Sequence, residues 1–294
     1  MNKYLIFRTD RIGDFLVTAI LLKCIKENDP NAHISVIGSL KNSAYIKTFP
    51  FVDKVIQLDN NFLSKIKVFF KVFRFKYKSI IIHDNKRRSK FISYFLKSTN
   101  KIDISDFKKN THIEIVKNIL KKMKFNFSNK ALNILSHRNP KNNNFKKNQI
   151  QLHFDEKWIF NDYIKRFINI EPAENELINF IKEIVKKKEK KLIITTGANL
   201  PNKMNKIENQ LNELKISLHK NLDFLELEKI TSQSNLLISC HGAISHVAAA
   251  YNIKQIDIID KTYNYSRWTN HFRNYNYLYR DNFPKLSCRI LNLI

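Results

Sequence analysis

The chain has 294 residues, and 43% of them are hydrophobic, which suffices for the core of one large domain or two ordinary ones. The longest apolar run near the N-terminus, 15–22, is too short to cross a bilayer, and the first residues lack the pattern of a cleavable signal. Three scattered cysteines have no metal-site spacing and suggest no disulfide framework. These features disfavour an integral membrane protein and a disulfide-stapled secreted domain, and we expect a cytoplasmic protein.

The formal net charge of +26 is concentrated in the first half of the chain. Residues 1–148 contain 31 Lys and Arg against 10 Asp and Glu, whereas residues 149–294 contain 21 against 16. Part of this excess reflects a general abundance of Lys, Asn and Ile. The asymmetry favours an anionic partner for the N-terminal half. Nucleic acid is one such partner, but the chain has no recognisable helix-turn-helix, zinc or RNA-binding motif, and we expect no nucleic acid.

Short apolar runs alternate with helical patterns through the first half. Strands are expected at 4–7, 33–37, 54–58, 79–83 and 101–104, and helical segments at 15–26, 42–48, 62–78, 86–96 and 112–125. Strands separated by segments of helix length are typical of βαβ units and a parallel sheet.

A second series of the same kind follows a stretch without periodicity. Residues 126–148 are rich in Asn, Lys and Ser and are expected to form a linker or long loop, with a domain boundary near 140–148 that gives domains 1–145 and 146–294. Further strands are expected at 149–154, 191–196, 216–218, 235–239 and 255–259. The tail from residue 263 is aromatic and basic and shows no clear pattern. The fold class is therefore α/β, with two Rossmann-like domains in tandem.

The first unit, 4–18, places an acidic residue at a position where ligands bind. An apolar strand is followed by a polar turn, by Gly13-Asp14 and at once by a helix. Ligands of open α/β sheets lie outside the carboxyl ends of the strands, which is where Asp14 stands. The alternative is that Asp14 only caps the helix, whose N-terminus favours a carboxylate.

Three stretches in consistent order resemble glycosyltransferase family nine, the bacterial ADP-heptose:lipopolysaccharide heptosyltransferases. They are 8–18, with its Gly-Asp turn; 152–158, a strand ending in histidine and followed by acidic residues, lysine and tryptophan; and 225–250, ending SCHGAISHVAAA. An Arg-Trp pair, Arg267-Trp268, is also similar. The resemblance covers roughly 1–270. It implies the GT-B arrangement, in which two Rossmann-like domains with parallel sheets face a central cleft, the N-terminal domain holding the acceptor and the C-terminal domain the nucleotide-sugar.

The resemblance also implies inverting, metal-independent transfer of heptose or a related sugar, with Asp14 as the catalytic base. The donor is expected to be ADP-linked, no further cofactor is implied, and the absence of an Asp-x-Asp triplet disfavours a metal. Expected donor-binding residues are Lys157, Thr196, Gly197, Asn199, Gly242, Ser245 and His246. Expected acceptor-binding residues are Arg11, Gly13, Lys86, Arg87 and Arg88; the last three are named for their charge just past a strand, and a plain solvated run is an equally good interpretation of them. For Lys157 a plain surface lysine, and for His246 a capping or core histidine, are equally good interpretations.

The sequence departs from the family's pattern near the donor motif. Cys240 stands where the family usually has an acidic residue two positions before the glycine, and His241 replaces the usual Thr or Ser. One extra residue separates Gly242 from His246, and Asn199 stands where some members have a glutamate. These departures leave the donor sugar open.

The segment 62–78 interleaves aromatic residues with six basic ones. On a helix, Phe62, Ile66, Phe69 and Phe73 form one stripe, and the simpler interpretation is that the helix packs on the sheet with it. The other is that a face of this helix meets anionic lipid at the inner face of the cell membrane, as a peripheral protein with a phosphorylated glycolipid acceptor would. For the whole protein, the alternative to a glycosyltransferase is a non-catalytic basic protein that binds anionic lipid or nucleic acid.

Overall fold

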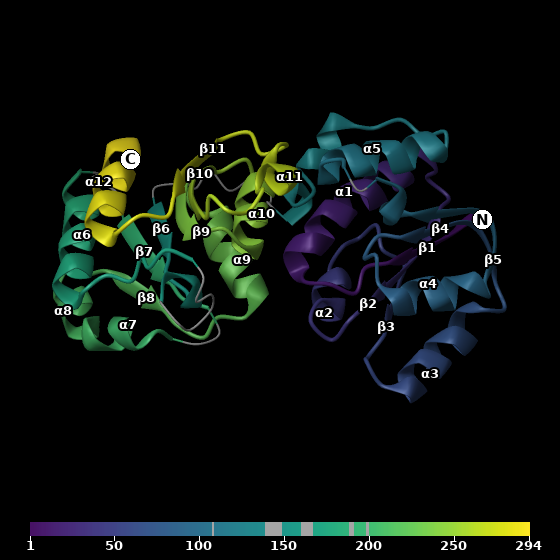
Figure 1. Cartoon of the computed structure of the whole chain (residues 1–294), viewed down its shortest axis with the longest axis horizontal. Coiled ribbons are helices and arrows are strands. Elements are labelled where there is room, and N and C mark those ends of the chain that lie inside the picture. The colour runs from purple at the N-terminus through teal and green to yellow at the C-terminus, as the bar shows by residue number, and fades with distance from the viewer. Residues whose placement is uncertain (108, 139–148, 160–166, 188–190, 198–199) are drawn as a thin grey trace. The chain divides into compact units, whose positions relative to one another are not determined.

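The computed structural model describes residues 1–107, 109–138, 149–159, 167–187, 191–197 and 200–294, and it divides into two compact units. The N-terminal unit comprises Met1–Ile134 with Ser266–His271, and the C-terminal unit comprises Leu135–Tyr265 with Phe272–Ile294 (Figure 1). The expected boundary at 145/146 lies outside the described residues.

The N-terminal unit is a parallel five-stranded sheet in the order β3-β2-β1-β4-β5. Its strands are β1 (Lys3–Phe7), β2 (His33–Gly38), β3 (Lys54–Gln57), β4 (Lys76–Ile82) and β5 (Lys97–Asp103). Its helices are α1 (Ile12–Asn28), α2 (Ser43–Ile46), α3 (Phe62–Val72), α4 (Arg87–Tyr94) and α5 (His112–Lys122), with short 3-10 turns at Ile104–Phe107 and Asn129–Leu132. Helices α1 and α5 lie on one side of the sheet, and α3 and α4 on the other (Figure 1).

The central strands are continuous apolar runs because both of their faces are covered. Tyr4 pairs in register with Ile34 of β2 and Ser79 of β4, and all residues from Tyr4 to Phe7 are buried. On the side of α3 and α4, strand residues such as Leu5 pack with Val68 and Val72 of α3.

The C-terminal unit is a parallel six-stranded sheet in the order β11-β10-β9-β6-β7-β8. Its strands are β6 (Gln149–His153), β7 (Lys191–Thr195), β8 (Ser217–His219), β9 (Leu236–Cys240), β10 (Lys254–Ile259) and β11 (Tyr275–Tyr279). Its helices are α6 (Glu174–Lys187), α7 (Asn202–Lys206), α8 (Glu208–Glu213), α9 (Phe224–Ser232), α10 (Ala243–Ala250) and α12 (Phe283–Leu293), with 3-10 turns at Ser136–Arg138 and Glu156–Trp158.

Both sheets reverse their strand order once, between β1 and β4 in the first unit and between β6 and β9 in the second. This is the doubly wound Rossmann topology, and the point of reversal is where such sheets open a crevice for ligands. The predicted α/β class with two Rossmann-like domains is confirmed.

The ten expected strands are present, and the main differences lie at helix ends and in the tail. The helical segment expected over 62–78 ends at Val72, because β4 begins at Lys76. The tail forms a short helix α11 (Ser266–Thr269), β11 and α12. Helix α11 is counted with the N-terminal unit, where Trp268 stacks on His112 of α5 with ring centroids 3.5 Å apart. Within the described ranges, no helix combines the length and apolar character needed to cross a bilayer.

Candidate active site

A pocket of about 530 Å³ lies at the carboxyl edge of the N-terminal sheet. Its walls come from the segments that follow β1, β2, β3 and β4, which the parallel topology brings to one edge. The lining residues are Thr9, Asp10, Arg11, Asp14, Ser39, Leu40, Lys41, Leu58, Asp59, Asn60, Lys86 and Arg88. Four cationic and three acidic side chains line this space, which suits a polar ligand that carries negative charge.

Asp14 lies in the first turn of α1 and lines this pocket. Its Oδ2 accepts a hydrogen bond from the backbone N–H of Arg11 at 3.1 Å, so it does cap the helix. Its side chain is nevertheless 21% exposed. The capping and ligand-facing interpretations are therefore compatible, since one carboxylate oxygen caps while the side chain lines the pocket.

Arg8, which sequence reasoning did not single out, holds the turn in place. Its guanidinium is 2% exposed and donates through Nε and Nη2 to the backbone carbonyl of Asp14 at 3.0 and 2.7 Å, and through Nη1 to the carbonyl of His83. It also lies 3.8 Å from the Asp14 carboxylate and 3.5 Å from that of Asp10. One buried cation thus ties the end of β4 to the start of α1.

A second carboxylate, Asp10, lines the pocket beside Asp14. It forms an ion pair with Lys86 at 3.2 Å, and burial raises the pKa of its carboxyl group above the usual range. The sequence signal was its place in the loop directly after β1, which leads into the helix that carries Asp14.

The end of β4 contributes two buried groups. Asp84 accepts hydrogen bonds from the hydroxyls of Thr9 at 2.6 Å and Ser89 at 2.8 Å. His83 Nδ1 lies 2.7 Å from the hydroxyl of Thr18, and burial holds the pKa of His83 well below its usual value, so the ring is neutral. These contacts fix the loop that carries Lys86 and Arg88 into the pocket wall.

Of the five expected acceptor-binding residues, three line the pocket: Arg11, Lys86 and Arg88. Arg88 donates through Nη1 to Asn60 on the opposite wall. Gly13 is buried inside α1, next to Asp14, and Arg87 is exposed at the start of α4 and is not among the lining residues.

In the C-terminal unit, Lys157 follows β6 and Gly242 follows β9, and the two residues lie next to each other. A Cβ atom built on Gly242 would lie 3.1 Å from Cε and 3.2 Å from Nζ of Lys157, so this glycine makes room for the lysine. Lys157 Nζ also contacts the buried carboxylate of Asp155, and its side chain is only 16% exposed. Lys157 is therefore a partly buried cation paired with Asp155 at the point where the strand order reverses, and its role in donor binding stays a prediction.

A buried carboxylate on β10, Asp257, organises the turn after β9 and was missed by sequence reasoning. Its side chain is fully buried. Its Oδ2 lies 2.6 Å from Nδ1 of His241, and its Oδ1 accepts from the hydroxyl of Ser245 at 2.9 Å and that of Ser239 at 3.3 Å. The turn after β9 has Cys240 in place of an acidic residue. Asp257 of the neighbouring strand β10 supplies a carboxylate to this turn instead.

The remaining expected donor-binding residues are mostly buried. Ser245 is fully buried, and His246, 6% exposed, makes edge-on ring contacts with His241 and Phe272 at centroid distances of 5.6 and 5.2 Å. Thr196 is buried and donates to the carbonyl of Gly197 at 3.2 Å. Asn199 lies outside the described residues.

A metal centre has no candidate in the part of the chain that the structure describes. No group of three or more His, Cys, Asp or Glu side chains there is arranged to hold a metal ion. His153, which is close to Thr195 and Asp155, is buried, and burial lowers its pKa to about 3.

The comparisons with known proteins place the fold in a class. No family model and no curated protein match the sequence. Solved structures do match, among them glycosyltransferases and UDP-GlcNAc 2-epimerases.

A glycosyltransferase of family nine from Veillonella parvula DSM 2008 is 14% identical, with a TM-score of 0.72, covering 99% of this chain and 91% of its own. An E. coli heptosyltransferase, WaaC, solved with ADP, is 10% identical with a TM-score of 0.74, covering 99% and 100%. A UDP-GlcNAc 2-epimerase from Methanocaldococcus jannaschii is 12% identical with a TM-score of 0.59, covering 100% and 92%. The chain therefore has the fold of family nine glycosyltransferases, and at these identities the likeness defines the fold alone.

Proposed function

We propose that the protein is an inverting glycosyltransferase of family nine that moves heptose or a related sugar from a nucleotide-sugar to a lipopolysaccharide-core or similar anionic glycan. One observation carries this proposal. Asp14 lines a pocket with Arg11, Lys41, Lys86 and Arg88 at the carboxyl edge of a Rossmann unit whose fold is that of heptosyltransferases.

Asp14 acts as the general base in this proposal. Inverting transfer needs one carboxylate to take the proton of the attacking acceptor hydroxyl, on the face of the sugar opposite the leaving group. The backbone N–H of Arg11 orients the Asp14 carboxylate, and the buried guanidinium of Arg8 lies 3.8 Å from it. The cations of the pocket wall bind the negative groups of the acceptor.

The C-terminal unit binds the donor in this proposal, and ADP-linked heptose is the first candidate. The leaving diphosphate gains charge, and Lys157 and the N-terminus of α10 stabilise it without a metal ion. The contact between Lys157 and Gly242 supports this assignment, as does the presence of ADP in the structure of the E. coli heptosyltransferase. Thr196, Gly197 and Asn199 would border the nucleoside, with Ser245 and His246 shaping the turn.

The proposal places the enzyme in the cytoplasm, peripherally on the inner face of the cell membrane, where a phosphorylated glycolipid acceptor is exposed. The charge of the first half of the chain supports this placement.

The test is transfer by Asp14→Asn with ADP-heptose and a heptose-deficient lipopolysaccharide acceptor. We expect turnover to fall by about a hundredfold to ten-thousandfold, while binding of ADP, measured by calorimetry, stays within about twofold. Asp106→Asn, at an exposed carboxylate of the same unit, serves as the control and should keep full activity. Near-normal turnover by Asp14→Asn would show that another group is the base, and wild-type protein that binds no nucleotide-sugar in a thermal-shift panel would overturn the proposal as a whole.

A further inference from the structure

The outer face of α3 is apolar and open to solvent. The helix packs on the sheet through Val68 and Val72, with Phe69 partly buried against them. Of the stripe expected to pack inward, Phe69 alone does so, since Phe62 is 72% exposed and Ile66 and Phe73 are exposed too; Phe70, outside that stripe, is 60% exposed. Leu63, Ile66 and Phe73 are also exposed on this face. Contiguous exposed apolar surface of this kind marks an interaction site.

The adjoining helix α4 extends this surface. Phe91, Tyr94 and Phe95 are all more than half exposed, and Phe95 meets Phe69 of α3 edge-on with centroids 6.1 Å apart. Phe91 and Tyr94 each contact Phe95 in turn. We call the exposed apolar residues of α3 together with these three the aromatic face.

The charge around the aromatic face has one sign. Residues 62–102 contain twelve Lys and Arg and a single acidic residue, Asp84. Asp84 is buried and takes hydrogen bonds from Thr9 and Ser89, so it does not face a partner. Lys67 and Lys71 are exposed on the flank of α3, one turn apart.

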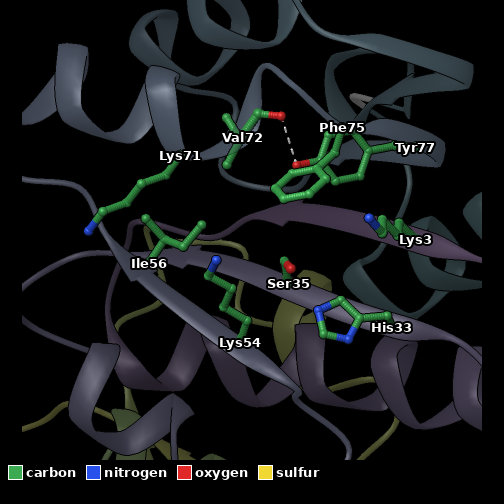
Figure 2. Close-up of a pocket in the computed structure, with 9 residues that line it drawn as sticks. All are labelled: Lys3, His33, Ser35, Lys54, Ile56, Lys71, Val72, Phe75 and Tyr77. Carbon is green, nitrogen blue, oxygen red and sulfur yellow. Dashed lines mark hydrogen bonds between the residues drawn. The ribbon is translucent and has the colours of Figure 1, made fainter.

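A small basic hollow of about 50 Å³ adjoins the C-terminal end of α3, at the amino ends of the strands. Its nine lining residues include Lys3, His33, Lys54 and Lys71 and no acidic side chain. Figure 2 shows the amino groups of Lys54 and Lys3 on the two sides of the space beneath the ring of Phe75, with the hydroxyl of Ser35 between them. Lys3 Nζ lies 4.1 Å from the centre of that ring.

The other end of the aromatic face meets the pocket that contains Asp14. Helix α3 begins just after Asn60, and α4 carries Arg88, and both residues line that pocket and bond to each other. A surface that binds lipid along α3 and α4 would therefore border the place where the acceptor is proposed to react.

We propose that the aromatic face docks on an anionic phospholipid bilayer, with its exposed rings in the headgroup region and the surrounding lysines on lipid phosphates. Aromatic rings flanked by basic side chains on an exposed helix are the features that favour interfacial binding. A second copy of the chain fits worse, because a symmetric contact through this surface would bring like charges together. This inference deepens the proposed function by naming how the enzyme reaches a lipid-linked acceptor.

The experiment is co-sedimentation of the full chain with vesicles of phosphatidylcholine, with and without phosphatidylglycerol. We expect binding to the anionic vesicles that weakens as salt is raised.

Leu63→Ser/Phe70→Ser should lower the partition coefficient about tenfold or more, and Lys67→Gln/Lys71→Gln about tenfold at low ionic strength. Matched controls on the C-terminal unit are Leu225→Ser/Tyr277→Ser, at exposed apolar residues, and Lys182→Gln/Lys186→Gln, at exposed lysines one turn apart on α6. These controls should bind as the wild type does.

Three outcomes would overturn the proposal: no binding to anionic vesicles, equal loss in the control variants, or a Leu63/Phe70-dependent dimer in analytical ultracentrifugation without vesicle binding. Circular dichroism of each variant checks that it is folded. ADP binding by the same samples tests the proposed function independently, since protein that binds ADP but not vesicles refutes the docking surface alone.

Discussion

Arg8 shows how one buried side chain can position a residue proposed for catalysis. Its guanidinium has almost no access to water, and its donors are directed to the carbonyls of Asp14 and His83. Desolvating such a cation is costly, and the cost is offset only while these acceptors and the nearby carboxylates of Asp10 and Asp14 stay in place. The position of Asp14 is therefore coupled to the folding of the whole carboxyl edge.

We predict that Arg8→Met lowers the free energy of unfolding by about 3 kcal/mol, because it leaves two buried carbonyls and two carboxylates without their cation. The measurement is urea denaturation followed by circular dichroism. Arg87→Met, at the exposed arginine of α4, should change stability by less than about 0.5 kcal/mol. Equal stabilities of the two variants would show that Arg8 does not have this structural role.

At the scale of elements, a glycine ends β2 and another lies in the turn after β9, for different reasons. A Cβ on Gly38 would lie 2.8 Å from Oδ1 of Asn42, whose amide group binds the carbonyls of Arg8 and Asp10. A Cβ on Gly242 would meet only the flexible end of Lys157 at these distances. The first glycine protects a packed loop, and the second leaves room for the side chain of Lys157.

Alanine should therefore affect stability at one glycine and ligand binding at the other. Gly38→Ala is expected to lower stability by about 1–3 kcal/mol, since Asn42 and the loop it holds must shift. Gly242→Ala should leave the melting temperature nearly unchanged but weaken ADP binding several-fold, because Lys157 is displaced from its position. Thermal melts and calorimetry with ADP separate the two, and unchanged ADP affinity in Gly242→Ala would contradict the role given to Lys157.

At the scale of the whole molecule, buried histidines couple stability to pH. Burial lowers the pKa of His112 and of His153 to about 3 and that of His271 to about 4, and it holds the pKa of His83 well below its usual value. In the unfolded chain these groups take up protons near pH 6.5. Below that pH the unfolded state binds more protons than the folded state, so folding becomes less favourable as the pH falls.

We predict that the melting temperature falls steadily from pH 7 to pH 5, with a loss of up to about 1.4 kcal/mol per pH unit for each of these histidines. The N-terminal unit, which contains His83, His112 and His271, should lose more than the C-terminal unit. His112→Gln should flatten the pH dependence measured by calorimetry. A melting temperature that is constant over this range would contradict the neutral, buried state of these rings.

Much of the fold could be predicted from the sequence because it depends on local patterns. Of the eleven strands in the described part of the chain, apolar runs marked ten, and the eleventh, Tyr275–Tyr279, was missed because its residues are aromatic and polar and mostly only half-buried. Part of the candidate site followed as well. In a parallel sheet the residues after each strand meet at one edge, so Arg11 and Asp14 share a pocket with Lys86 and Arg88, although the two pairs are far apart in the chain.

Other features depend on contacts between segments that no local pattern reveals. Asp257 reaches Ser245 and His241 only because β10 pairs with β9, and Arg8 reaches the carbonyl of His83 only when β1 and β4 are neighbours. The sequence by itself determined the alternation of strands and helices and the residues at strand ends, since these follow from the spacing of apolar side chains. Only the tertiary structure decided that α3 buries Val68 and Val72 and exposes Phe62 and Phe70, because the face of a helix that is covered depends on what packs against it.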